Sequence, residues 1–419
     1  MLAELLYWLF PYQIFKSVFF RAGLAYLTAF LLVNFIMPKV IRAFRRHGLT
    51  ADFTPYEESR GPYAGATPIM GGVVLLPAVL FAFSLWGWFN RYSVVLMLVT
   101  LAFGAVGALD DWAKVLQKRR ILAGVEEKKS YADKADGISG GLRLGLEFLI
   151  TIGAVLFLVI ENGGLDTHLH IPGVPMKSWM PELSQWFFIP FVVLVIVGGA
   201  NAVNLTDGLD SLATVPVITS AVFIGAAAYI TGDVEWSERL KILYLTEQLK
   251  ELVVFAITLI AACFAFLKFN SPPASIYMGD VGSLGMGAAI STMFVLVGAE
   301  LYLPIVGGTF VLAAISVIIQ RVWFKVAAKK KGRDWALKNR FFYRAPYHHH
   351  TQELLTFREE GPQVRSIWHD WAVKLGWGKL SDEDKYLNRE QVNNKVIWNN
   401  HLRAVFLLVI ALMIFFKVR

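Results

Sequence analysis

Ten apolar stretches, each long enough to cross a lipid bilayer as a helix, dominate this 419-residue chain. A hydrocarbon core about 30 Å thick needs roughly 20 apolar residues in helical form. With 56% hydrophobic and 17% charged residues, the composition also excludes an ordinary soluble domain. The sequence therefore predicts an all-α, polytopic integral membrane protein that forms a single domain over residues 1–419. The expected spans lie near 23–41, 71–89, 92–109, 144–160, 187–203, 212–231, 252–269, 284–300, 304–322 and 402–418.

The first 20 residues, MLAELLYWLFPYQIFKSVFF, form a separate apolar segment. It lacks the basic start and the small-residue cleavage site of a secretory signal, and Pro11 interrupts it. We therefore expect a helix that lies at the membrane interface rather than a signal that is cleaved.

Lysine and arginine are distributed unevenly between the two sides of the predicted membrane. If the ten spans alternate in direction, one side carries most of the 40 Lys and Arg residues, and the positive-inside rule makes that side cytoplasmic. Both termini are then periplasmic. The net charge of +8 suits anionic lipid and phosphorylated metabolites as partners, and we expect no nucleic acid. The connections on the basic side are 42–70, 110–143, 204–211, 270–283 and 323–401.

Asp110 and Asp111 are the first of several polar groups on this side, within the motif GALDDWAK. Carboxylates beside a membrane span are costly unless they are functional or solvated at the interface, and both readings are open. Adjacent helical residues point about 100° apart, so the pair can face one site only at its edge or where the helix ends. Lys114 and Lys118 follow on the next turns and supply positive charge without a metal.

Asp280 lies in a glycine-rich turn, YMGDVGSLGMG, just before an expected span. A helix N-cap would be a sufficient role for it. However, Gly279 and Gly282 would let a phosphate approach closely, and Mg²⁺ uses one or two carboxylates together with phosphate oxygens and water. The sequence leaves capping and metal binding as alternatives.

Three consecutive histidines, His348, His349 and His350, occur in the motif APYHHH of the last large connection. Consecutive helical residues diverge around the axis, so the three rings cannot converge on one metal ion. With Arg340 and Arg344 nearby, we expect imidazoles that donate hydrogen bonds to a phosphate and carry charge near neutral pH.

The stretch GANAVNLTDGLDSLA joins two apolar spans with an unusual number of polar residues. Asn201, Asn204, Asp207 and Asp210 recur every three residues, but over nine residues the direction drifts by about 180° around a regular helix. All four can line one pocket only if the helix breaks, and we expect the break at Gly208.

Together and in this order, these motifs resemble those of the phospho-MurNAc-pentapeptide transferase family, a branch of the polyprenyl-phosphate N-acetylhexosamine-1-phosphate transferases. The resemblance implies transfer of phospho-MurNAc-pentapeptide from UDP-MurNAc-pentapeptide to undecaprenyl phosphate, giving lipid I and UMP. It also implies Mg²⁺ as cofactor, a bacterial inner membrane with the active site facing the cytoplasm, and a homodimer.

By the same resemblance, Asp280 would bind Mg²⁺, while Asp110 would deprotonate or orient the lipid phosphate and Asp111 would support it. A covalent two-step mechanism, with Asp280 as the nucleophile, is the alternative. The positions that match the family's substrate contacts are Lys114, Lys118, Asn204, Asp207, Asp210, Asn270, Tyr277, His348, His349 and His350.

The chain also departs from the family pattern. Ala64 stands where a lysine is common, Ile69 where a threonine is common, and Arg143 replaces a family lysine, while residues 360–400 form an unusual insertion. Two rival functions are a sibling transferase that uses UDP-GlcNAc and a secondary transporter. The APYHHH motif argues against the sibling. The position of the polar residues at one membrane rim argues against a transporter, whose polar residues lie at mid-membrane.

Overall fold

The computed structural model describes residues 2–50, 67–122, 124, 137–160, 167–174, 181–356, 364–375 and 387–417. Within these residues the structure is almost entirely helical, and its strands are two residues long: β1 (Asn339–Arg340) pairs in parallel with β2 (Arg365–Ser366). Nine of the described helices are long and apolar enough to cross a membrane, and α3 (Gly72–Trp86) is shorter. The predicted all-α, polytopic fold is confirmed.

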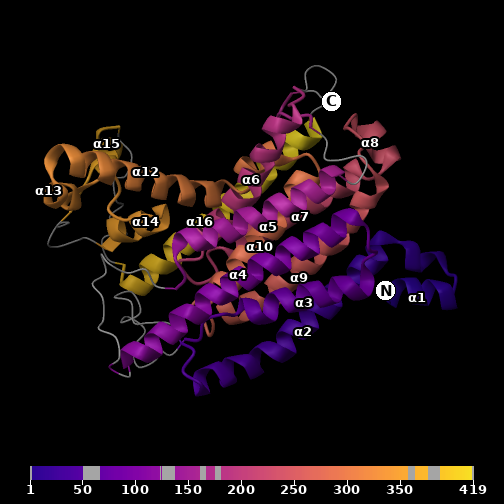
Figure 1. The fold of residues 1–419 in the computed structure, drawn as a ribbon, viewed down its shortest axis with the longest axis horizontal. Helices are drawn as coiled ribbons and strands as arrows, with labels where there is room; N and C mark the ends of the chain where they lie inside the picture. The colour runs from indigo at the N-terminus through magenta and orange to yellow at the C-terminus, as the bar shows by residue number, and fades with distance from the viewer. Residues whose placement is uncertain are drawn as a thin grey trace.

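Most long helices lie side by side in one bundle (Figure 1). Several helices extend beyond the predicted spans: α4 continues well past residue 109, α10 begins before residue 284, α12 continues past residue 322, and α16 begins before residue 402. The hydropathy pattern marks only the apolar part of a helix, whereas the polar turns at its end stay helical. The long helices are α2 (Val18–Arg46), α4 (Arg91–Leu122), α5 (Gly140–Ile160), α6 (Gln185–Thr206), α7 (Thr214–Thr231), α9 (Glu251–Asn270), α10 (Gly279–Leu296), α12 (Gly308–Lys331) and α16 (Arg389–Lys417).

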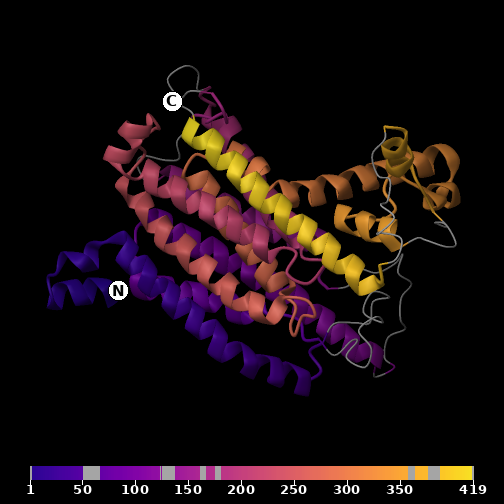
Figure 2. The ribbon, with the colours of Figure 1, turned by 180° about the vertical axis from the view of Figure 1, so that it is seen from behind.

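Short helices connect and flank the bundle. The N-terminal α1 (Leu2–Leu9) ends before Pro11, as the sequence predicts, and projects from the bundle in Figures 1 and 2. Its Trp8 side chain is exposed, which agrees with an interfacial position. The other short elements are η1 (Gln13–Lys16), α8 (Val234–Leu240), η3 (Glu247–Lys250), η4 (Glu300–Tyr302), α11 (Leu303–Val306), α13 (Arg333–Lys338), α14 (Tyr347–Thr356) and α15 (Ile367–Lys374).

Helix α10 is the centre of the bundle. Every residue from Val281 to Leu296 is buried, and the helix packs against α4, α6 and α3. The contact with α4 is between backbones, because a Cβ atom added to Gly107 would collide with the carbonyl group of Asp280. Gly72 of α3 lies equally close to the backbone of Gly282. These glycines fix the depth at which the first turn of α10 sits.

The connections that the sequence places on one side of the membrane contact one another at one end of the bundle. The Lys118 ammonium of α4 donates a hydrogen bond to the carbonyl of Thr50 (2.8 Å), which follows α2. The Ala274 amide donates to Asp210 Oδ2 (2.9 Å) and so joins the connection before α10 to the one after α6. The polar motifs are therefore neighbours in space although they are far apart in the sequence.

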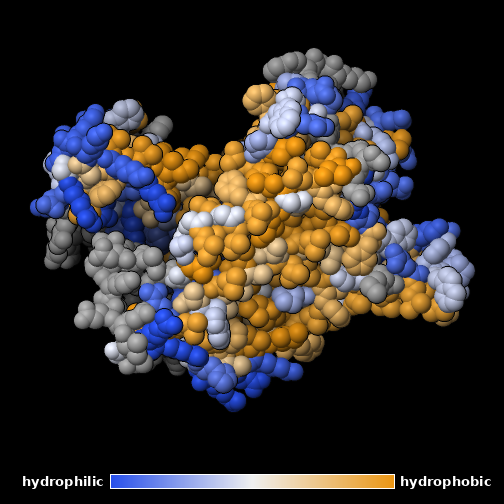
Figure 3. All heavy atoms as spheres, viewed as in Figure 1, coloured by the Kyte–Doolittle hydropathy of each residue, from blue (hydrophilic) through white to orange (hydrophobic). Residues whose placement is uncertain are grey.

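Apolar side chains cover the middle of the bundle surface, and polar ones gather at its ends (Figure 3). Helix α12 leaves the bundle at an angle, and α13, α14 and α15 lie near its outer part (Figures 1 and 2).

Of the predicted insertion at 360–400, only 364–375 and 387–400 are described, as α15 and the first turns of α16 with their flanks. Ala64 lies outside the described residues, while Ile69 is half-buried, and its amide donates to the carbonyl of Leu49.

Replacement of Gly107 by alanine should lower the free energy of unfolding by about 1–3 kcal/mol, because the added methyl group meets backbone that cannot move aside. Gly153→Ala in α5 is the matched control, since nothing lies within 4 Å of its added Cβ. Thermal unfolding of both variants in detergent would test this. Equal unfolding temperatures for the two variants would contradict the proposed close contact.

Candidate active site

Asp280 lies in the first turn of α10, where it is held by side chains from two other helices. Its Oδ2 accepts a hydrogen bond from the Lys114 ammonium (2.7 Å), and its Oδ1 accepts one from the Asn204 amide (2.6 Å). The N-cap position belongs to Met278. The capping reading of Asp280 is therefore wrong, and its carboxylate is directed to groups of α4 and α6.

Asp110 and Asp111 both lie within α4, which does not end there as one reading of the sequence required. Lys114 lies near both, but their other partners differ. Asp110 forms an ion pair with Lys114 (2.8 Å) and accepts a hydrogen bond from the Ile138 amide (2.9 Å). Asp111 accepts a hydrogen bond from the Val281 amide (3.1 Å) at the start of α10, where the helix dipole favours a negative charge.

Arg143 of α5 completes this arrangement. Its guanidinium lies 3.4 Å from Asp280 and 3.8 Å from Asp110. Two groups orient it from behind: Asn201 accepts a hydrogen bond from Nη2 (3.0 Å), and the fully buried Glu147 lies 3.4 Å from Nε. The Asn201 amide in turn donates to Glu147, so the three side chains form one network.

We call these charged residues the acidic cluster: Asp110, Asp111, Glu147, Asp280, Lys114 and Arg143. If all of them are ionised, four negative charges face two positive ones. The surplus of negative charge makes the cluster attractive to a further cation.

Asp207 occupies the C-cap position of α6, next to the cluster. Burial raises the pKa of its carboxyl to about 8, and the charges of Asp280 and Asp111 act in the same direction. The predicted helix break is confirmed, because α6 ends at Thr206 and α7 begins at Thr214.

Several residues that match family substrate contacts have internal partners in the structure. Asp210 holds the Ala274 amide, and the buried Asn270 accepts from Ser211 and Thr214 and donates to Ile276. Lys118 binds the Thr50 carbonyl, one helical turn beyond the acidic cluster, and Tyr277 is half-buried before α10. Their roles as substrate contacts stay predictions.

The three histidines are in helix α14 and have different surroundings, as expected for consecutive residues. His350 Nδ1 accepts a hydrogen bond from the Tyr343 amide (3.1 Å), and its ring stacks on the Tyr343 ring. His349 Nδ1 lies 2.6 Å from the Gln352 side chain. The ring of His348 approaches Gly208, where an added Cβ would lie 2.6 Å from its Nε2.

Burial lowers the pKa of His349 and of His350 to about 4, and that of His348 falls well below its usual range. Arg344, which is close to His349, acts in the same direction on its pKa. The rings are therefore neutral at pH 7 in the ligand-free protein. The expectation that they carry charge beside a phosphate stays a prediction, and a neutral ring still donates one hydrogen bond.

Comparison with known proteins identifies the family to which this chain belongs. A glycosyl transferase family 4 model matches residues 93–298. The phospho-N-acetylmuramoyl-pentapeptide-transferase of Gemmatimonas aurantiaca is 36% identical over 377 residues, which cover 87% of this chain and 93% of that protein. The chain belongs to the phospho-N-acetylmuramoyl-pentapeptide-transferase family.

Glu147 is the residue of this transferase's cluster that sequence reasoning missed. An acidic residue inside an apolar span is expensive unless it is paired, so its position within 144–160 was the available signal. Its contact with Asn201 could not be inferred, because Asn201 lies on another helix.

Glu147→Gln should lower turnover about tenfold, or roughly 1.4 kcal/mol, because Arg143 loses the charge that orients it towards Asp280. The loss should be much smaller in an Arg143→Lys background, since the two substitutions remove one interaction. Steady-state kinetics of the two single variants and the double variant would measure this coupling. Additive losses would show that Glu147 does not act through Arg143.

Asp207 should make stability depend on pH. With a pKa of about 8 when folded and 3.8 when unfolded, it keeps a proton in the folded state that the unfolded chain has lost. The free energy of unfolding should therefore fall as pH rises from about 4 to 8, by up to ~1.4 kcal/mol per pH unit. Asp207→Asn should remove this part of the slope, as measured by thermal unfolding in EDTA at pH 5.5 to 8. An unchanged slope would contradict the raised pKa.

Proposed function

We propose that this protein transfers phospho-MurNAc-pentapeptide from UDP-MurNAc-pentapeptide to undecaprenyl phosphate. The name of its Gemmatimonas relative states the group transferred, and the identity extends over most of both chains. The observation that carries the proposal is the acidic cluster, in which Asp110, Asp111 and Asp280 come together at the start of a buried helix. Such a site suits phosphoryl transfer, which depends mainly on positioning and charge neutralisation.

In the proposed reaction, a phosphate oxygen of the lipid attacks the sugar-bearing phosphorus of the nucleotide substrate. The diphosphate bond to UMP breaks, and UMP leaves with the electron pair. In this proposal Asp110 accepts a proton from the lipid phosphate or orients it, while Lys114 and Arg143 stabilise negative charge on the transferred group. The alternative in which Asp280 forms a covalent intermediate uses the same residues.

We further propose Mg²⁺ as the cofactor, bound through Asp280 and one neighbouring carboxylate. The Lys114 ammonium lies 2.7 Å from Asp280 and 2.8 Å from Asp110, so both carboxylates already bind one cation, the lysine side chain. The cluster still has a surplus of negative charge. No group of three His, Cys, Asp or Glu in the described part of the chain forms a metal site by itself. This agrees with an ion that takes its other ligands from phosphate and water. When bound, Mg²⁺ would neutralise charge on the diphosphate.

The location follows from the uneven distribution of basic residues. We propose an inner-membrane protein whose acidic cluster faces the cytoplasm, where a nucleotide substrate is available. The homodimer stays a prediction. The rival functions find less support, because the relative's name specifies the pentapeptide substrate and the polar motifs of the sequence lie together at one end of the bundle.

Asp280→Asn should lower the rate of UMP release at least 100-fold, because the group that aligns Lys114 and binds Mg²⁺ loses its charge. Asp233→Asn, which changes an acidic N-cap of α8, is the matched control and should keep its activity. The assay would contain UDP-MurNAc-pentapeptide, undecaprenyl phosphate and Mg²⁺, with UDP-GlcNAc as a competing donor. Failure of the unmodified protein to release UMP, or full activity with UDP-GlcNAc alone, would overturn the proposal.

The metal assignment has a separate test that does not depend on activity. Mn²⁺ binding, followed by electron paramagnetic resonance, should be weakened at least tenfold by Asp280→Asn and unchanged by Asp233→Asn. Equal binding by both variants would remove Asp280 from the metal site and leave the transfer reaction untouched.

A further inference from the structure

Helix α15 belongs to the insertion at 360–400, and one of its faces is apolar although it is exposed. Trp371 is 63% exposed, and Leu375, the C-cap residue of the helix, is 58% exposed. With the half-buried Ile367 they recur every four residues, so the three side chains form one stripe along the helix. Exposed apolar side chains that lie together usually mark an interaction site. This stripe therefore needs an apolar partner outside the helix.

The opposite face of α15 fixes the helix to the outer part of α12. The Trp368 ring stacks on the Phe341 ring (centroids 6.4 Å apart), and the Trp368 amide donates a hydrogen bond to the Phe341 carbonyl (2.9 Å). Phe341 in turn contacts the Trp323 ring of α12 (6.1 Å), and the Trp323 indole donates to the Asn339 carbonyl (2.9 Å). Helix α15 is therefore held close to the level of Trp323, beside the outer part of α12 (Figures 1 and 2).

The exposed side chains of α12 change in character along the helix. Those in its first half, from Leu312 to Ile318, are apolar, and the apolar surface of the bundle continues along α12 in Figure 3. Beyond Ile318, the exposed Val322 and Val326 alternate with exposed cations, and the helix ends in three exposed lysines at 329–331. A mixture of apolar, basic and tryptophan side chains is characteristic of the bilayer interface. The level of Trp323, and so of α15, is that interface.

This outer part of the protein is also strongly basic. Among the residues of α13 and α15 only Asp334 and Asp370 are acidic, and Asp370 forms an ion pair with Arg365 (2.6 Å). A layer of anionic headgroups is complementary to such a surface, because juxtamembrane basic clusters are attracted to anionic lipid. The exposed cations are Arg321, Lys325, Lys329, Lys330 and Lys331 of α12, Arg333 and Lys338 of α13, and Lys374 of α15.

We propose that α15 and the basic outer part of α12 dock on the anionic headgroup layer of the membrane that surrounds the bundle. Trp371 and Leu375 insert among the lipids, and the lysines lie at the headgroups. The partner is the phospholipid surface rather than the lipid substrate, so the inference goes beyond the transfer reaction and assigns this surface no chemical step. The segment that contains α14 is then held by the bundle at one side and by the bilayer at the other.

The depth of single spin labels on α15 tests this proposal. Cys263, the only cysteine of the chain, is fully buried, so a nitroxide label attaches to a cysteine introduced at the surface. Trp371→Cys and Leu375→Cys would each be labelled in the full-length protein, in nanodiscs that contain phosphatidylglycerol and no nucleotide substrate. Leu375→Cys keeps Trp371 in place. Val373→Cys is the matched control, because Val373 is exposed on another side of α15.

We expect collisions with a water-soluble nickel chelate, measured by electron paramagnetic resonance, to be about threefold less frequent at positions 371 and 375 than at 373. Collisions with oxygen should show the reverse order, because oxygen concentrates in the apolar phase. Equal accessibility to the nickel chelate at the three positions would overturn the proposal. So would disulfide cross-linking of Trp371→Cys between two copies, since a second protomer would then cover the face.

The contribution of charge has its own arm of the experiment. Replacing the three lysines at 329–331 by glutamine should remove most of the protection at position 375, as should nanodiscs made of phosphatidylcholine alone. Replacing Arg42, Arg45 and Arg46 by glutamine is the matched control, because it removes the same charge from the exposed end of another long helix, α2, and should leave the protection unchanged. Protection that is equal with and without phosphatidylglycerol would contradict docking on anionic lipid. None of these results depends on the transferase activity.

Discussion

The structure depends on keeping several carboxylates together beside the first turn of α10. Asp110, Asp111, Glu147 and Asp280 come from three helices, and among the described residues only Lys114 and Arg143 oppose their charge directly. Like charges at such distances repel, so packing must hold them in place. The backbone contact at Gly107 does this, because it brings α4 and the first turn of α10 together without an intervening side chain. A site whose carboxylates repel one another in this way is suited to bind a cation together with a phosphorylated substrate.

The same constraint explains why α10 is buried along almost its whole length. A helix that faced lipid could not present its first turn to side chains from several neighbours. Because α3, α4 and α6 surround α10, Asn204 reaches Asp280 from one side while Lys114 reaches it from another. The amide of Val281 then remains available to Asp111. Packing in the apolar part of the bundle therefore sets the geometry at its polar end.

The membrane spans and the helix break after α6 could be predicted from the sequence. Apolar length gives the spans, and the three-residue spacing from Asn201 to Asp210 gives the helix break, since both depend on local periodicity. The contacts of Asn270 with Ser211 and of Glu147 with Asn201 could not be predicted in the same way. Asn270 holds Ser211, far from it in the chain, and Glu147 meets Asn201 across two helices. The capping reading of Asp280 failed for a similar reason, because tertiary contacts overrode a local preference.

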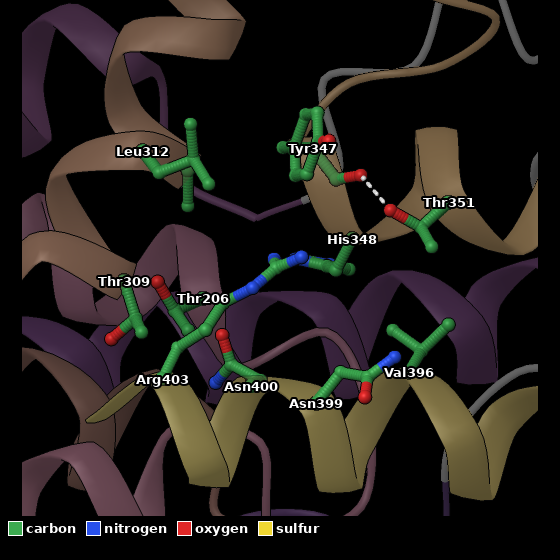
Figure 4. Close-up of a pocket in the computed structure, with 11 residues that line it drawn as sticks. Thr206, Thr309, Leu312, Tyr347, His348, Thr351, Val396, Asn399, Asn400 and Arg403 are labelled. Atoms are coloured by element: carbon green, nitrogen blue, oxygen red, sulfur yellow. Dashed lines mark hydrogen bonds between the residues drawn. The ribbon is translucent and has the colours of Figure 1, made fainter. Parts of the chain in front are cut away.

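The turn that follows α6 separates two regions of opposite electrostatic character. On one side, burial and the negative field of the acidic cluster raise the pKa of Asp207. On the other, Gly208 lies against His348, which lines a small pocket together with Arg403 (Figure 4). A larger residue than glycine at position 208 would strike the His348 ring, so the turn can pass between the regions only because it lacks a side chain there.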